Sequence, residues 1–234
     1  MDLQQIINNC IKFNHWLLSS DCVLCTASVR LDIQLCQGCY DDLPWYHQPQ
    51  CLQCGLLSNH VICGKCLKES PYFDATHAAL RYEFPLDAMM QRYKYGASLQ
   101  FGNIFAQLLL TRNLSREIDL LIPMPLHPQR LQERGFNQSL EIAKVLAKKL
   151  QILLDYQSVI RTKLTPPQAS LPLKERAKNI KGVFAVNGDL TGKRIAIVDD
   201  VMTSGASLNE LAKILKKAGA AHVECWVVAR TLPH

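Results

Sequence analysis

The chain has 234 residues, of which 48% are apolar and 20% are charged, and it carries a formal net charge of +6. This composition is that of a folded globular protein and excludes a disordered or fibrous chain. No run of about 18 or more uncharged apolar residues exists, so the sequence predicts no transmembrane helix and no membrane insertion. A chain of this length is expected to form one ordinary domain and a small appendage.

Apolar residues recur along residues 3–17 as they do on one face of an amphipathic helix. We expect this helix to pack on the rest of the protein, and a partner-binding helix is the alternative. Asp2, Lys12 and the lack of a small-residue cleavage site argue against a signal peptide, so we expect a cytoplasmic protein. Without an export signal, the ten cysteines indicate metal binding rather than disulfides.

Eight of the cysteines form four C-x-x-C pairs, all before Ser70: Cys22/Cys25, Cys36/Cys39, Cys51/Cys54 and Cys63/Cys66. Tetrahedral coordination of Zn²⁺ by four thiolates uses two such pairs, so we expect two zinc sites. Sequential pairing joins the first pair with the second and the third with the fourth, but the spacing leaves a crossed pairing open. Four cysteines per ion leave no open position for catalysis, so both sites are expected to be structural.

The cysteine pattern predicts a zinc-ribbon module at 1–70 and a larger domain at 71–234. Residues 127–181 carry 11 basic and 4 acidic side chains, whereas residues 1–70 carry 4 basic and 6 acidic ones. Eight thiolates with two Zn²⁺ would add −4 to the module (−8 + 4). Any surface that binds single-stranded DNA through charge is therefore expected on the larger domain.

Strands alternate with helices throughout the larger domain. We expect strands at 76–84, 119–123, 157–161, 183–186, 194–199 and 222–229, and helices at 86–93, 99–113, 139–150 and 206–218. Residues 124–138 are expected to form a Pro-rich loop. This alternation predicts an α/β fold with a mostly parallel sheet flanked by helices.

The strand at 194–199 leads into a pattern typical of a sugar-phosphate site. Its apolar run ends in two adjacent carboxylates, Asp199 and Asp200. A loop of small residues then opens the next helix, and it consists of Thr203, Ser204, Gly205, Ala206 and Ser207. Open α/β sheets bind ligands at the carboxyl ends of their strands, and free N–H groups at a helix N-terminus favour a phosphate.

The two carboxylates need a partner other than the phosphate, because they would repel it. Ionised carboxylates only accept hydrogen bonds, and a ribose offers two vicinal hydroxyl donors. Taken alone, Asp199 and Asp200 could form a Mg²⁺ site, but they are more typical of a solvated strand end. The whole run from the strand to the helix favours a ribose 5-phosphate instead.

This run resembles the signature of the type I phosphoribosyltransferases, which is an apolar strand, two acidic residues and a Thr/Ser-rich phosphate loop. The resemblance implies that Asp199 and Asp200 bind the ribose of phosphoribosyl pyrophosphate, which is bound with Mg²⁺, and that residues 203–207 bind its 5-phosphate. The implied reaction expels pyrophosphate, whose charge Arg, Lys and Mg²⁺ can stabilise. Arg130 and Arg134 are the candidates for this contact, and Lys94 is a further candidate ligand-binding residue.

Three further stretches resemble the ComF/GntX branch of the same superfamily. They are Arg134-Gly135-Phe136-Asn137-Gln138, then Tyr93-Lys94-Tyr95-Gly96, and a later set comprising Gln168, Leu171, Arg176 and Asn179. With the cysteine module, this resemblance covers nearly the whole chain from Cys22 onward. It implies a role in natural competence, in which bacteria handle incoming single-stranded DNA.

Three functional hypotheses follow. The first is a phosphoribosyltransferase that acts in DNA uptake on an acceptor the sequence does not identify. The second is a sensor whose pocket binds the donor and controls a protein or DNA contact. The third is an adaptor that docks on the DNA-uptake machinery, such as a helicase, through its zinc ribbons.

Overall fold

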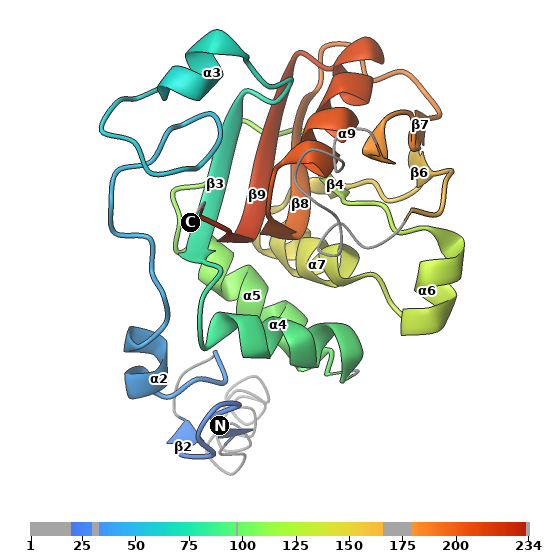
Figure 1. The fold of residues 1–234 in the computed structure, drawn as a ribbon. Coiled ribbons are helices and arrows are strands. Elements are labelled where there is room, and N and C mark those ends of the chain that lie inside the picture. Colours follow the sequence, from blue (N-terminus) through green and yellow to red (C-terminus); the bar gives the residue numbers. More distant parts are fainter. Residues whose placement is uncertain (1–19, 30–32, 97, 166–178, 233–234) are drawn as a thin grey trace, which may run out of the picture. The chain divides into compact units, whose positions relative to one another are not determined.

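The structure is a computed structural model that describes residues 20–29, 33–96, 98–165 and 179–232 (Figure 1). The helix expected at 3–17 lies outside these residues, as do Gln168, Leu171 and Arg176. The chain divides into two compact units, Met1–Leu43 and Pro44–His234. The sequence places a boundary near residue 70, whereas in the structure the last two cysteine pairs belong to the same unit as the sheet.

The first unit is built around the first two cysteine pairs. Strand β1 (Ser20–Asp21) pairs antiparallel with β2 (Ser28–Val29), and Cys22 and Cys25 lie in the turn between them. Helix α2 (Gln37–Asp41) follows, with Cys36 as its N-cap. Buried apolar residues fill this small unit, among them Val29, Ile33, Leu35 and Leu43.

The second unit contains a five-stranded parallel sheet with the strand order β3-β9-β8-β4-β5. The strands are β3 (Ala75–Arg81), β4 (Leu120–Pro123), β5 (Leu153–Leu154), β8 (Arg194–Met202) and β9 (His222–Arg230). Strands β8 and β9 are central and almost entirely buried, because helices cover both faces of the sheet. This arrangement confirms the parallel α/β sheet that the sequence predicts.

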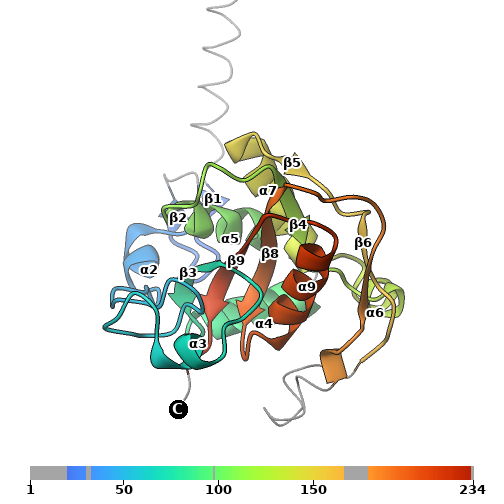
Figure 2. The ribbon, with the colours of Figure 1, turned by 90° about the horizontal axis from the view of Figure 1, so that it is seen from above.

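Helices α5 (Gln100–Leu110) and α7 (Gln138–Leu150) pack on one face of the sheet (Figures 1 and 2). Helix α9 (Ala206–Lys217) covers the other face, together with a separate antiparallel pair formed by β6 (Val159–Arg161) and β7 (Phe184–Val186). Ile195 and Ile197 of β8 lie in one core cluster with Leu208 and Leu211 of α9. Helix α4 (Leu86–Tyr95) packs against α5, and α3 (Gly64–Lys68) lies in the cysteine-rich segment.

The second unit differs from the sequence prediction in several places: the sequence does not predict β5, β3 ends at Arg81 rather than near residue 84, and two further differences affect the site. The segment expected to be a loop contains helix α6 (Pro128–Arg134), which His127 caps by accepting a hydrogen bond from the Gln129 N–H (3.2 Å). Strand β8 also continues past Asp199 and Asp200 to Met202, because it stays paired with β9 as far as Arg230. None of the described helices combines the length and the apolar character that a membrane span requires.

Candidate functional site

A cavity of about 300 Å³ opens where β8 ends and α9 begins. Most of the residues that the sequence predicts to form the site line it: Lys94, Arg134, Asp199, Asp200, Thr203, Ser204, Gly205, Ala206 and Ser207. Tyr82, Tyr95, Ser139 and Arg161 line it as well. The structure therefore joins the acid pair and the small-residue loop in one site.

The acid pair lies within β8 and is held by neighbours from two helices. The Ser139 hydroxyl at the start of α7 donates to Asp199 Oδ1 (2.9 Å), and the backbone N–H of Asp200 donates to the same oxygen (2.9 Å). Lys94 Nζ, in the last turn of α4, forms an ion pair with Asp200 Oδ2 (2.8 Å). The site therefore contains its own cation beside the carboxylates.

These contacts set the charge of the site. Burial and the neighbouring Asp200 carboxylate raise the pKa of Asp199 to about 7, although the Ser139 hydroxyl acts in the opposite direction. Burial would lower the pKa of Lys94, but the Asp200 carboxylate outweighs it and raises that pKa above its ordinary value. Near neutral pH, Lys94 is thus charged while Asp199 is close to its titration midpoint.

Residues 203–207, which we call the phosphate loop, turn sharply from β8 into α9. Gly205 is the N-cap of α9 and adopts a left-handed conformation (φ 80°) that favours glycine. A Cβ at this position would lie 2.8 Å from Cε of Met202. The Ala206 N–H donates to the Ser204 hydroxyl (3.3 Å), while the free N–H groups of a helix N-terminus attract anions. The loop can therefore receive a phosphate through backbone donors.

The Arg134 to Gln138 motif forms the rim of the cavity. Arg134 donates to the Gln138 side-chain oxygen (2.6 Å), and its guanidinium lies 5.6 Å from the centre of the Tyr95 ring. Gly135 ends α6 in the left-handed conformation (φ 82°). Arg134 is thus held at the cavity in an orientation that suits an anionic group.

The rest of this motif anchors α7 beside the acid pair. Asn137 is the N-cap of α7, since its side chain accepts from the N–H groups of Ser139 (3.0 Å) and Leu140 (3.3 Å). Its amide also donates to the Met124 carbonyl (3.1 Å), and so ties α7 to the end of β4. Phe136 packs against Tyr93 with ring centres 5.4 Å apart. These contacts position Ser139 for its hydrogen bond to Asp199.

Arg130 and Arg161 differ in their position relative to the cavity. Arg130 forms an ion pair with Glu133 on α6 (2.9 Å) and does not line the cavity. Arg161 lines the cavity from β6, and its buried Nε has no hydrogen-bond partner among the described residues. Burial lowers the pKa of Arg161, while the Asp199 carboxylate raises it. Arg161 begins a second basic segment whose charge could also stabilise the leaving pyrophosphate, and it is a better candidate than Arg130 for binding an anion.

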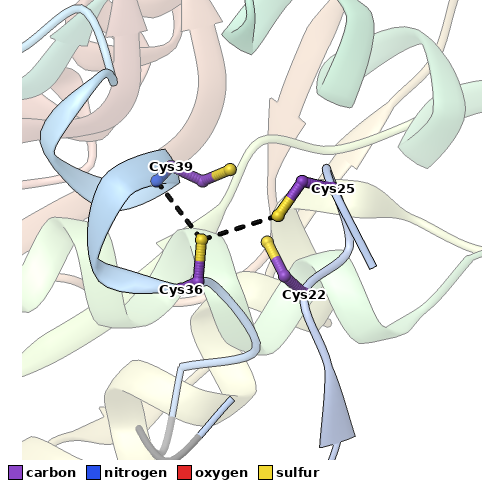
Figure 3. Close-up of side chains that lie close together, drawn as sticks. All are labelled: Cys22, Cys25, Cys36 and Cys39. Atoms are coloured by element: carbon purple, nitrogen blue, oxygen red, sulfur yellow. Dashed lines mark hydrogen bonds between the residues drawn. The ribbon is translucent and has the colours of Figure 1, made fainter. Parts of the chain in front are cut away.

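The eight cysteines gather into two groups, and both follow the sequential pairing. Figure 3 shows the first group, Cys22, Cys25, Cys36 and Cys39, with their side chains converging from the turn after β1 and from the start of α2. Cys51, Cys54, Cys63 and Cys66 form the second group, which we call the second cysteine cluster. Within each group the sulfur atoms lie within 4.8 Å of one another, so the crossed pairing is excluded.

The geometry of both groups fits a tetrahedral zinc ion. A Zn–S distance of about 2.3 Å places neighbouring sulfurs about 3.8 Å apart. The Cys25–Cys36 sulfurs are 3.6 Å apart and the Cys54–Cys63 sulfurs 3.7 Å.

Two family models match this chain. The phosphoribosyl transferase domain matches residues 137–232, which include the acid pair and the phosphate loop. The double zinc ribbon domain matches residues 13–67, which include all eight paired cysteines. The matches agree with the parallel sheet and with the two cysteine groups.

Curated relatives match the chain over nearly its whole length. The DNA utilization protein YhgH of Escherichia coli (strain K12) is 30% identical over 229 residues, which cover 95% of this chain and 94% of that protein. The chain belongs to the ComF/GntX family. Competence protein F of Haemophilus influenzae is 32% identical over 89% of this chain and 96% of its own, and competence protein ComFC of Streptococcus pneumoniae is 23% identical over 97% of each. The family resemblance and the fold that the sequence predicts are confirmed.

Proposed function

We propose that the cavity binds phosphoribosyl pyrophosphate with Mg²⁺ and transfers its phosphoribosyl group to an acceptor. The observation that carries this proposal is the joint placement of two opposite chemistries in one cavity of about 300 Å³. The phosphate loop offers donors to an anion, and Asp199 and Asp200 offer acceptors to hydroxyls. A ribose 5-phosphate presents both groups a short distance apart.

Each part of the donor has a matching group in this chain. The phosphate loop receives the 5-phosphate, and Asp199 and Asp200 accept hydrogen bonds from the ribose hydroxyls. Arg134 and Arg161 face the departing pyrophosphate, where their charge opposes the negative charge that develops as the bond breaks. Mg²⁺, when bound with the donor, further neutralises the pyrophosphate oxygens. The bond from the anomeric carbon to pyrophosphate breaks as the bond to the acceptor forms.

Lys94 has a role before the donor arrives. Its ammonium group forms an ion pair with Asp200 Oδ2 (2.8 Å). Two buried carboxylates in adjacent positions repel each other, and a nearby ammonium group reduces this repulsion. Lys94 therefore prepares the acid pair to accept hydrogen bonds.

We further propose that this activity serves DNA uptake and use in the cytoplasm. The names of the relatives, competence protein F and DNA utilization protein, support this assignment. Single-stranded DNA or a protein of the uptake machinery, such as a helicase, is the proposed macromolecular partner. Residues 127–181, with 11 basic and 4 acidic side chains, are the proposed site of any DNA contact.

Pyrophosphate release from labelled donor, measured across a panel of nucleobase, nucleotide and amine acceptors, tests the transferase. The double variant Asp199→Ala/Asp200→Ala should abolish release and transformation while both zinc ions stay bound. The matched control is Asp41→Ala/Asp42→Ala, an exposed adjacent pair in the first unit, which should leave both unchanged. Tight binding without release would indicate a sensor, and full transformation by the first double variant would indicate an adaptor.

A further inference from the structure

The second cysteine cluster is attached to the sheet through consecutive backbone carbonyls of its first C-x-x-C turn. The N–H of Thr76 on the edge strand β3 donates to the Leu52 carbonyl (2.8 Å), and the Thr76 hydroxyl donates to the Gln53 carbonyl (2.6 Å). The Tyr46 hydroxyl donates to the Gly55 carbonyl (2.9 Å). The edge strand of the sheet is therefore bonded directly to the turn that carries Cys51 and Cys54.

Arg230 takes the remaining carbonyl of the same turn. It is the last residue of β9 and only 3% exposed, and its Nε donates to the Cys54 carbonyl (3.0 Å). The other end of its guanidinium donates to the carbonyls of Met202 (2.8 Å) and Thr203, where β8 enters the phosphate loop. One buried side chain thus joins a metal-ligand residue to the loop that is proposed to bind phosphate.

The peptide group transmits this contact to the N–H groups of the loop. Each peptide unit is planar and trans, so its carbonyl and its N–H point in opposite directions. Holding the carbonyls of Met202 and Thr203 therefore fixes the directions of the N–H groups of Thr203 and Ser204. Both of these residues line the cavity.

The guanidinium is well suited to this bridging position. Its donors form a rigid planar fork, so a shift of the Cys54 carbonyl at one end displaces the hydrogen bonds at the other. A buried charge also needs its hydrogen bonds satisfied, which penalises any arrangement in which one end is released. A lysine offers a single point of donation and cannot span both ends.

We propose that Arg230 is a positioning residue that couples metal binding at the second cysteine cluster to the order of the phosphate loop. Metal bound at the second cluster fixes the Cys54 carbonyl, Arg230 carries that constraint to the carbonyls of Met202 and Thr203, and the loop N–H groups are held ready for a phosphate. The consequence for ligand affinity rests on the proposed function, but the order of the loop does not. The first cysteine group has no part in this coupling.

Amide hydrogen exchange in peptides covering residues 202–208 tests the coupling without any ligand. Arg230→Gln should keep both zinc ions and raise exchange in this segment at least about tenfold, the scale expected for losing a hydrogen bond to a charged group. Arg230→Lys should do the same although it keeps the charge. Arg81→Gln is the matched control, because Arg81 lies beside Arg230 in the sheet register and should leave loop exchange unchanged.

Variants of the cysteines test the metal half of the coupling. Cys66→Ser should lose one zinc ion and accelerate loop exchange as Arg230→Gln does, whereas Cys39→Ser should lose one zinc ion and leave the loop unchanged. Unchanged loop exchange in Arg230→Gln would overturn the proposal. Acceleration that is as large in α7 as in the loop would overturn it too, because it would reflect general loss of stability.

Calorimetry with phosphoribosyl pyrophosphate and Mg²⁺ separates this inference from the proposed function. If the wild type gives no binding heat, the proposed function fails, while the exchange results still decide the coupling. If the wild type binds, Arg230→Gln and Cys66→Ser should each weaken binding at least about tenfold while Cys39→Ser does not. If Arg230→Gln and Cys66→Ser both bind the donor with wild-type affinity, the coupling is overturned while the proposed function stands.

Discussion

Replacing Asp199 by Asn should make the protein more stable while it removes the proposed ligand binding. Burial and the Asp200 carboxylate raise the pKa of Asp199 from an ordinary 3.8 to about 7, so the folded state disfavours the charged form. Both hydrogen bonds to this side chain, from the Ser139 hydroxyl and the Asp200 N–H, end on Oδ1. Asn keeps that acceptor and carries no charge.

The size of the effect follows from the pKa difference. A pKa that rises on folding contributes stability below the unfolded-state value and loses it as the pH rises through the folded-state value. The pKa of Asp199 is 3.8 in the unfolded chain and about 7 in the folded protein, and each tenfold change in the ionisation constant corresponds to about 1.4 kcal/mol. The loss in free energy of unfolding at high pH therefore approaches about 4 kcal/mol. Solvent in the cavity and the nearby Lys94 reduce this, so we expect Asp199→Asn to gain about 1–3 kcal/mol at pH 8 and less than half of that at pH 5.

Urea unfolding of the variant and the wild type at both pH values measures this difference directly. Asp155→Asn is the matched control, since burial raises the pKa of Asp155 but its hydrogen bonds with Ser158 and Gln157 outweigh this and lower that pKa. Asp155→Asn should therefore be less stable than the wild type at pH 8, where Asp199→Asn is more stable. A variant at position 199 that is no more stable than the wild type at pH 8, or whose gain does not shrink at pH 5, would refute the reasoning.

Three further predictions concern the loop, the α7 cap and pH. Gly205→Ala should weaken phosphoribosyl pyrophosphate binding about tenfold in calorimetry. Residue 205 has a φ of 80°, and a Cβ there would lie 2.8 Å from Met202 Cε, so alanine strains the loop. Unaltered affinity would contradict the proposed loop geometry. Asn137→Ala should cost about 1 kcal/mol or more in urea unfolding through loss of the cap and of the hydrogen bond to the Met124 carbonyl. Asn137→Asp should restore only the cap, because a carboxylate cannot donate to that carbonyl. Donor affinity should rise up to about tenfold from pH 6 to pH 8 as Asp199, with its pKa of about 7, ionises; an affinity that is the same at both pH values would contradict this assignment.

Lys94 and Arg134 could be predicted only through the family resemblance, whereas other parts of the site follow from local chemistry. Asp199, Asp200 and the phosphate loop follow one another within a few residues, and the C-x-x-C pairs present two sulfurs from one turn. Their grouping therefore does not depend on the rest of the fold. Ser139 and Asp199 are 60 residues apart in the sequence, and Arg230 and Cys54 are 176 residues apart. Neither contact can therefore be predicted from the spacing of nearby residues.

Two of the differences between the predicted and observed elements, those beside the site, have physical causes. Prolines between Pro123 and Pro128 favour a loop, but Pro128 occupies the first helical position, where its missing N–H costs nothing, and α6 begins there. Strand β8 continues because its hydrogen bonds to β9 persist beyond the apolar run, and this pairing is a property of the sheet rather than of the segment. The acid pair therefore lies inside the strand, where burial shifts the pKa of Asp199.

Titration calorimetry of phosphoribosyl pyrophosphate with Mg²⁺ tests most directly whether the turn from β8 into α9 holds a sugar phosphate. The wild type and Asp41→Ala/Asp42→Ala should each bind one donor per chain, and Asp199→Ala/Asp200→Ala should give no heat of binding. No binding by the wild type, or equal binding by the Asp199→Ala/Asp200→Ala protein, would contradict the account.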